Sequence, residues 1–271
     1  MRLAIRHTTY YRFAEPVTHG LQRLRLTPKT SHGQHIREWA MTFEGAQAEL
    51  EYDDHNVNRV TLVSVLPGAE EVTVRCEGEV DTEDNAGLIG SHSGHLPLWA
   101  FLGQTSRTRA GQGIRGLAAA ARRADGDTLA MLHGLSTTIL QQVRYRPGVT
   151  DVGTTAEEAL AAGHGVCQDH AHVFIAAARA LEVPARYVSG YLMMNDRVEQ
   201  DATHAWAEAH VDGLGWVGFD VANGISPDAR YVRVATGRDY GEAAPITGIS
   251  FGAAQEELRV ALAVEQRAVD Q

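Results

Sequence analysis

The sequence GHGVCQDHAHVFIAAARALEVP spans residues 163–184 and decides how the second half of the chain folds. The glycines at its start break one helix. Apolar residues at helical spacing then predict a new helix that begins near Cys167 and ends at Val183-Pro184. Cys167 therefore lies in the first turn of a helix, where unpaired backbone N–H groups and the helix dipole favour a thiolate and can stabilise an oxyanion. Because a lone cysteine is more often a small buried apolar residue, this position alone leaves both interpretations open.

Residues 203–220, THAWAEAHVDGLGWVGFD, predict a β-hairpin with its turn at 212–215. His204 and Asp220 both lie towards the end of the hairpin remote from this turn. A symmetric loop with an even number of residues would put them on opposite faces of the sheet. We therefore predict an odd-length loop or a bulge, which brings Asp220 opposite Trp206 and diagonal to His204, at about 7–8 Å between Cα atoms. A regular hairpin with an even loop would contradict this assignment of Asp220.

Cys167, His204 and Asp220 together have the composition of a nucleophilic triad. In such a triad Cys167 is the nucleophile, His204 is first the base and then the acid, and Asp220 is the group that holds the imidazole. The alternatives for the last two are a buried core histidine and an aspartate that caps the end of a strand.

A zinc site is the rival chemistry, because the second half also contains histidines at positions 164, 170, 172, 204 and 210. Cys167 and His170 can share a helix face, but His172 points elsewhere, and no second cysteine is near in the sequence. We therefore expect no metal and no cofactor at this site. A binding module that has lost its activity is the third hypothesis.

The chain divides into three parts. Alternating apolar and polar residues, with turn residues between them, predict an antiparallel β domain over 1–84, in the form of a sandwich. A linking region over 85–126 is rich in Gly, Ser, Arg and Ala and includes a short alanine-rich helix near 116–124. Residues 127–271 predict helices followed by strands, the last of them over 259–264. The predicted fold class is therefore α+β, with helices packed on an antiparallel sheet in this second half.

Composition excludes several classes of partner. The chain has 24 Lys+Arg against 34 Asp+Glu, a formal net charge of −10, and no basic block, so we expect it to bind neither nucleic acid nor a membrane surface. Two cysteines in 271 residues cannot form a disulfide framework. The N-terminus lacks the continuous apolar segment of a signal peptide, so we expect a cytoplasmic, reducing location.

Four motifs in the second half closely resemble the bacterial transglutaminase-like family: Gly165–His172, Pro184–Tyr191, His204–Glu208 and Gly215–Asp220. The N-terminal half is similar to the β domain that precedes the core in that family. The resemblance implies a papain-like transglutaminase core over 127–271. It assigns Cys167, His204 and Asp220 as the catalytic triad, with no departure at any of them.

The same resemblance implies thiol-dependent acyl transfer on an amide or peptide bond through a thioester, with a peptide or protein as the substrate. It favours hydrolysis, by a cysteine protease or amidase, over transfer to an amine, although the sequence itself selects neither acceptor. We expect Asp169 to cap its helix, Trp206 to pack in the core, and Arg238 to have a structural role. Gln168 either supports the oxyanion or faces solvent. The sequence does not set the oligomeric state.

Overall fold

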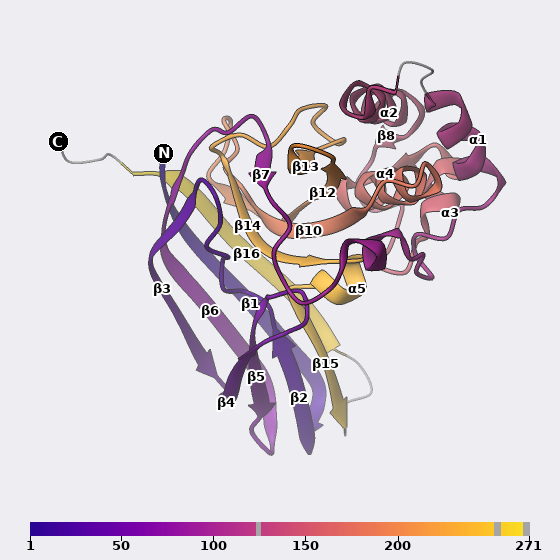
Figure 1. The fold of residues 1–271 in the computed structure, drawn as a ribbon. Coiled ribbons are helices and arrows are strands. Elements are labelled where there is room, and N and C mark those ends of the chain that lie inside the picture. Colours follow the sequence, from indigo (N-terminus) through magenta and orange to yellow (C-terminus); the bar gives the residue numbers. More distant parts are fainter. Residues whose placement is uncertain (123–125, 252–255, 268–271) are drawn as a thin grey trace.

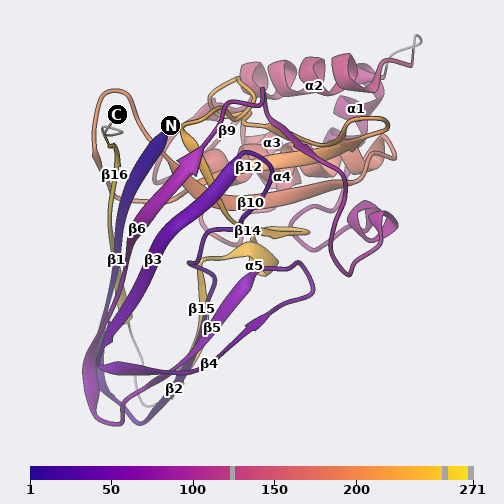
Figure 2. The same cartoon turned by 60° about the vertical axis from the view of Figure 1, so that its left-hand side comes forward.

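The N-terminal half forms two antiparallel sheets that face each other (Figure 1). The computed structural model describes residues 1–122, 126–251 and 256–267. The strands of this half are β1 (Arg2–Val17), β2 (His19–Leu24), β3 (Gln34–Glu44), β4 (Ala46–Asp53), β5 (Arg59–Val65) and β6 (Ala69–Thr82). Figure 2 shows the long strands β1, β6 and β3 running beside the second sheet, which contains β2, β5 and β4.

Apolar side chains from the two sheets share one buried cluster. Tyr11, Val72 and Val74 come from the first sheet, and Leu24 and Val63 come from the second. Their alternation with exposed neighbours places one face of each strand in this cluster. The predicted antiparallel sandwich is confirmed.

The second half is a helical layer packed on a third antiparallel sheet, whose strand order is β14-β10-β12-β13-β7. Its strands are β7 (Leu88–Gly90), β10 (Ala185–Leu192), β12 (His204–Val211), β13 (Gly215–Phe219) and β14 (Tyr231–Gly237). The helices are the 3-10 turn η1 (Leu98–Leu102), α1 (Gln112–Ala121), α2 (Thr128–Gln142), α3 (Ala156–Ala162), α4 (Cys167–Ala180) and α5 (Tyr240–Ala243). Two short strands, β8 (Arg144–Tyr145) and β9 (His164–Gly165), pair in parallel. The α+β class is confirmed.

Helix α4 is the centre of this half. It contacts β12 and β10 on one side and α1, α2 and α3 on the other (Figure 1). All of its residues from Asp169 to Arg179 are buried. Alanines at 176, 177 and 178, together with the small odd-numbered residues of β12, let the helix lie close to the sheet. The sheet therefore holds the start of α4 at a fixed place.

Strand pairing departs from the predicted division of the chain. The C-terminal strands β15 (Ile246–Phe251) and β16 (Glu256–Gln266) fall within the predicted core, but they pair with β2 and β1 of the sandwich. The short β11 (Glu199–Gln200) also pairs with β16, and β7 from the predicted linking region forms an edge of the core sheet. The alternation over 259–264 identifies a strand but not its partner, so placing these strands in the core was wrong.

The sandwich and the core pack against each other through apolar side chains. Leu3, Ile5 and Val80 of the first sheet share a buried cluster with Tyr191 and Val232 of the core sheet. No helix among the described residues is both long and apolar enough to cross a membrane.

Candidate active site

The loop before Cys167 is held by the side chain of Asp169, which is buried in the first turn of α4. Its Oδ2 accepts hydrogen bonds from the Val166 backbone N–H at 2.8 Å and from Thr150 Oγ1 at 2.7 Å. A Cβ on Gly165 would lie only 2.6 Å from the Asp169 Cβ, so glycine leaves room for this contact. Asp169 caps the helix as predicted and positions the turn that carries the cysteine.

The hairpin of β12 and β13 has the predicted irregularity. Val211 pairs with Gly215, which leaves a three-residue loop, and the register continues to Ala207 opposite Phe219. One step further along this register, Asp220 stands opposite Trp206 and diagonal to His204. His204 Nε2 donates a hydrogen bond to Asp220 Oδ2 at 2.6 Å. The odd-length loop is therefore confirmed, and it brings these two side chains together.

Asp220 is fully buried and has further donors. Its Oδ2 accepts from Tyr231 Oη and from Asn223 Nδ2, each at 2.7 Å. Burial alone raises the pKa of Asp220. The hydrogen bond and the charge of His204, together with the hydrogen bonds from Tyr231 and Asn223, outweigh burial and lower this pKa. Asp220 is thus a carboxylate at neutral pH. The sequence analysis assigned no role to Asn223 or Tyr231. For Asn223, the only indication in the sequence is that it is a turn residue three positions after Asp220. Nothing in the sequence indicates Tyr231.

Cys167 is the second hydrogen-bonding partner of His204. Burial lowers the His204 pKa, but hydrogen bonds with Asp220 and Cys167, together with the charges of those groups, raise it to about 10. The imidazole therefore lies between the Cys167 side chain and the Asp220 carboxylate, and both contacts favour its protonated form. Cys167 is partly exposed. The structure brings all three predicted residues together.

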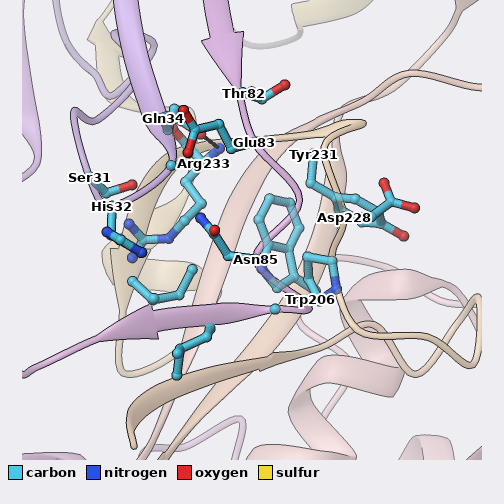
Figure 3. Close-up of a pocket in the computed structure, with 15 residues that line it drawn as sticks. Ser31, His32, Gln34, Thr82, Glu83, Asn85, Trp206, Asp228, Tyr231 and Arg233 are labelled. Atoms are coloured by element: carbon cyan, nitrogen blue, oxygen red, sulfur yellow. Dashed lines mark hydrogen bonds between the residues drawn. The ribbon is translucent and has the colours of Figure 1, made fainter. Parts of the chain in front are cut away.

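Aromatic rings surround the dyad of His204 and Asp220. Trp206 stacks on His204 with ring centroids 6.2 Å apart and meets Tyr231 edge-on at 5.4 Å. Trp206 is buried, as expected for a core aromatic. Figure 3 shows Trp206, Tyr231 and Asp228 in the wall of a small pocket on the face of the sheet away from α4. The stacking fixes the plane of the imidazole.

Tyr145 is an aromatic residue that sequence reasoning missed. Its ring stacks on His170 at 6.3 Å, and about half of it is exposed. Burial raises the pKa of Tyr145, and the charges of Cys167 and Asp220 raise it further, which places the phenol within the field of the site. Only the parallel pairing of β8 with β9 brings this residue beside the nucleophile loop.

The histidines of α4 make contacts to the backbone. His170 Nδ1 lies 2.9 Å from the Val166 carbonyl oxygen and its Nε2 lies 2.8 Å from that of Val143. His172 Nε2 accepts from the Tyr240 N–H at 3.2 Å, and burial, aided by nearby arginines, lowers its pKa to about 3. In the ranges that the structure describes, no three His, Cys, Asp or Glu side chains gather into a cluster able to hold a metal ion.

Gln168 lies next to Cys167, whereas Arg238 lies outside the site. Gln168 is partly buried in the first turn of α4, next to the cysteine. Arg238 bonds Glu242 at 2.7 Å and lies away from the triad, beyond the end of β14. Its contact agrees with a structural role.

Two family profiles match this chain. The profile of the transglutaminase-like superfamily matches residues 115–221, which include Cys167, His204 and Asp220. The profile of the bacterial transglutaminase-like N-terminal region matches residues 3–81, which form most of the sandwich.

Relatives cover nearly the whole chain. An uncharacterized protein of Mycobacterium tuberculosis is 31% identical over 280 residues, covering 92% of this chain and 88% of its own length. An uncharacterized protein of Mycobacterium leprae is 26% identical over 293 residues, covering 98% and 99%. The crystal structure of a "Putative Cysteine Protease" from Cytophaga hutchinsonii superimposes with a TM-score of 0.77 at 22% identity, covering 100% of this chain and 92% of that one. The last comparison shows that the two share a fold.

Proposed function

This chain belongs to the bacterial transglutaminase-like family, and we propose that it hydrolyses an amide or peptide bond through a thioester on Cys167. The observation that carries the proposal is the His204 imidazole, which hydrogen-bonds both Cys167 and the buried Asp220 carboxylate. The start of α4 adds the backbone N–H groups that such a reaction needs.

The first half of the reaction forms the acyl-enzyme. The Cys167 thiolate attacks the carbonyl carbon of the scissile amide, and N–H groups at the start of α4 stabilise the resulting oxyanion. His204, protonated at rest, donates its proton to the leaving nitrogen as the carbon–nitrogen bond breaks. An amine leaves, and a thioester on Cys167 remains.

The second half releases the acid. His204 is now neutral and accepts a proton from the attacking water, whose oxygen adds to the thioester carbonyl. The carbon–sulfur bond then breaks, which frees the carboxylic acid and restores the thiolate beside the imidazolium. Asp220 keeps the imidazole in one orientation through both halves. An amine in place of water would give the transglutaminase reaction instead.

The substrate class and location follow as parts of this proposal. An amide of a peptide or protein is the substrate, and a reducing, cytoplasmic location keeps the thiol active. Cys167 is unpaired, and so is Cys76, the other cysteine.

Trapping the acyl-enzyme tests the proposal. The protein is mixed with a tryptic digest of a bacterial lysate, quenched in acid, and the Cys167 peptide is analysed by mass spectrometry. We expect a mass addition on Cys167 that hydroxylamine removes, and we expect none in His204→Ala. Cys76→Ala is the matched control and should acylate normally, because Cys76 is buried in the sandwich.

A second measurement identifies the acceptor. With ethanolamine present, a hydrolase releases mainly the free acid, whereas an amine-accepting enzyme releases the ethanolamide. A well-folded wild-type protein that never acylates at Cys167 would overturn the enzyme assignment, and a predominance of ethanolamide would overturn the hydrolytic one.

A further inference from the structure

A cavity of about 560 Å³ lies between the sandwich and the core, on the face of the core sheet away from α4. Its walls are the 27–36 segment, the turn between β4 and β5, residues 89–93, and two core arginines, Arg186 of β10 and Arg233 of β14. This volume is within the usual range for small-molecule pockets. The proposed mechanism uses none of these residues.

Positive charge exceeds negative charge at this wall. Arg186 and Arg233 flank one buried carboxylate, Glu208, with nitrogen–oxygen distances of 2.6 Å for each arginine. Lys29 donates to the Asn56 carbonyl, to an asparagine oxygen and to a threonine hydroxyl, all of them neutral groups. The two arginines therefore share one carboxylate, and the Lys29 amine beside them is bound by neutral groups only. Arg59 also lines the cavity, but Glu51 and Asp53 compensate its charge.

The electrostatics of these groups agree with that excess. Burial lowers the pKa of Lys29, and the charges of Arg233 and Arg186 lower it further. Burial alone raises the pKa of Glu208, but the same two arginines outweigh it and lower the pKa to about 2. The single carboxylate is thus fully ionised, and the surplus remains positive.

The guanidinium groups of Arg186 and Arg233 also have N–H donors that make no hydrogen bond to the described residues. Within the described ranges, Arg186 uses only Nε in a hydrogen bond, and its Cζ lies 3.9 Å from the Trp216 ring centroid. Arg233 uses Nε and Nη2, both on Glu208. The remaining terminal nitrogens belong to two buried arginines that line the cavity. Planar guanidinium donors match the oxygens of a carboxylate or phosphate.

We propose that this cavity binds a small molecule through a carboxylate or phosphate group, which the free donors of Arg186 and Arg233 hold. The rest of the wall fits an uncharged body: Ile36, Val57 and Ile89 are apolar, and serine and threonine hydroxyls lie among them. Ser31, His32, Ile89 and Arg233 also line the smaller pocket beside Trp206. Figure 3 shows Arg233 reaching toward His32 in this shared wall. The ligand therefore sits on the face of the sheet that also carries Trp206, the ring stacked on His204.

Binding of citrate and of inorganic phosphate tests the proposal, each measured at constant ionic strength set with sodium chloride. Isothermal titration calorimetry should show one saturable site, and the Tm should rise by about 5 °C at a ligand concentration of 100 times Kd. Citrate binding alone identifies a carboxylate site, and phosphate binding alone identifies a phosphate site. No saturable heat or Tm shift with either anion would overturn the proposal.

Variants locate the site. Arg186→Lys keeps the charge beside Glu208 but loses the planar fork, and should weaken binding tenfold or more. Ser91→Trp fills the cavity from an exposed position without touching the buried ion pairs. It should abolish binding, whereas Ser106→Trp, exposed and outside the cavity wall, should not. Equal affinity in the two tryptophan variants would refute the assignment even if Arg186→Lys does not fold.

Discussion

Replacing Asp220 with asparagine preserves the shape of this side chain but removes the charge that holds His204 protonated. The lost contact is a 2.6 Å hydrogen bond from His204 to a fully buried carboxylate. A hydrogen bond to a charged group contributes about 1.5–3 kcal/mol. Since about 1.4 kcal/mol corresponds to one pKa unit, the pKa of His204, about 10 in the wild type, should fall by roughly one to two units. The imidazolium beside the Cys167 sulfur is then lost at a lower pH than in the wild type.

Alkylation by iodoacetamide, measured from pH 6 to pH 10.5, reports this change, because only a thiolate reacts and a neighbouring imidazolium favours that form. In Asp220→Asn, the change of the second-order rate constant at Cys167 that follows His204 should occur roughly one to two pH units lower, with labelling followed by mass spectrometry. Cys76 does not interfere: it is 1% exposed, and burial raises its pKa to about 12.

Asp212→Asn is the matched control, because Asp212 lies in the loop of the same hairpin with its side chain fully exposed. Cys167 of this variant should be alkylated with the wild-type pH profile. The reasoning fails if Asp220→Asn retains the wild-type circular dichroism spectrum and Tm and its Cys167 also keeps the wild-type pH profile.

Three further predictions concern stability. In Gly190→Ala the new Cβ would lie 2.1 Å from the Val232 carbonyl oxygen, so urea unfolding should show a loss of at least about 2 kcal/mol. Thr155→Ala removes the side chain that caps α3 in a capping box and should cost about 0.5–2 kcal/mol in the same assay, whereas Thr155→Ser should cost less. The pKa of Glu208 is lowered in the folded state, so its contribution is complete above the ordinary value of 4.5 and is lost as the pH falls towards 2. The free energy of unfolding should fall by about 3 kcal/mol over that range from this group alone, and a Glu208→Gln variant should show a flatter pH dependence.

The grouping of Cys167, His204 and Asp220 could be predicted because each of these residues has a local signature in the sequence. Cys167 follows a glycine-broken loop at the start of an apolar helix, and this pattern depends only on neighbours in the sequence. The relation of His204 to Asp220 follows from counting residues around one short turn, and the observed register agrees with the count. Because side chains alternate strictly along a strand, His204 and Asp220 share a face only if the loop has an odd number of residues.

The groups that complete the site could not be predicted in this way. Tyr231 reaches Asp220 from β14, which is joined to the hairpin only through β10. Tyr145 comes next to the loop before Cys167 through the short β8–β9 pairing, in which it stands opposite Gly165. No local sequence pattern links Tyr231 or Tyr145 to the site, because the position of each depends on which strands become neighbours.

The sequence by itself determined the α+β class, the helix that begins at Cys167 and the odd loop that unites His204 with Asp220. Only the tertiary structure decided that β15 and β16 return to the sandwich, and that Arg186 and Arg233 meet around Glu208. A net charge of −10 gave no sign of a cationic cavity. The physical reason is that caps, turns and alternation are set by residues a few positions apart. Sheet order and the local balance of charge depend on residues that come together only when distant strands pair.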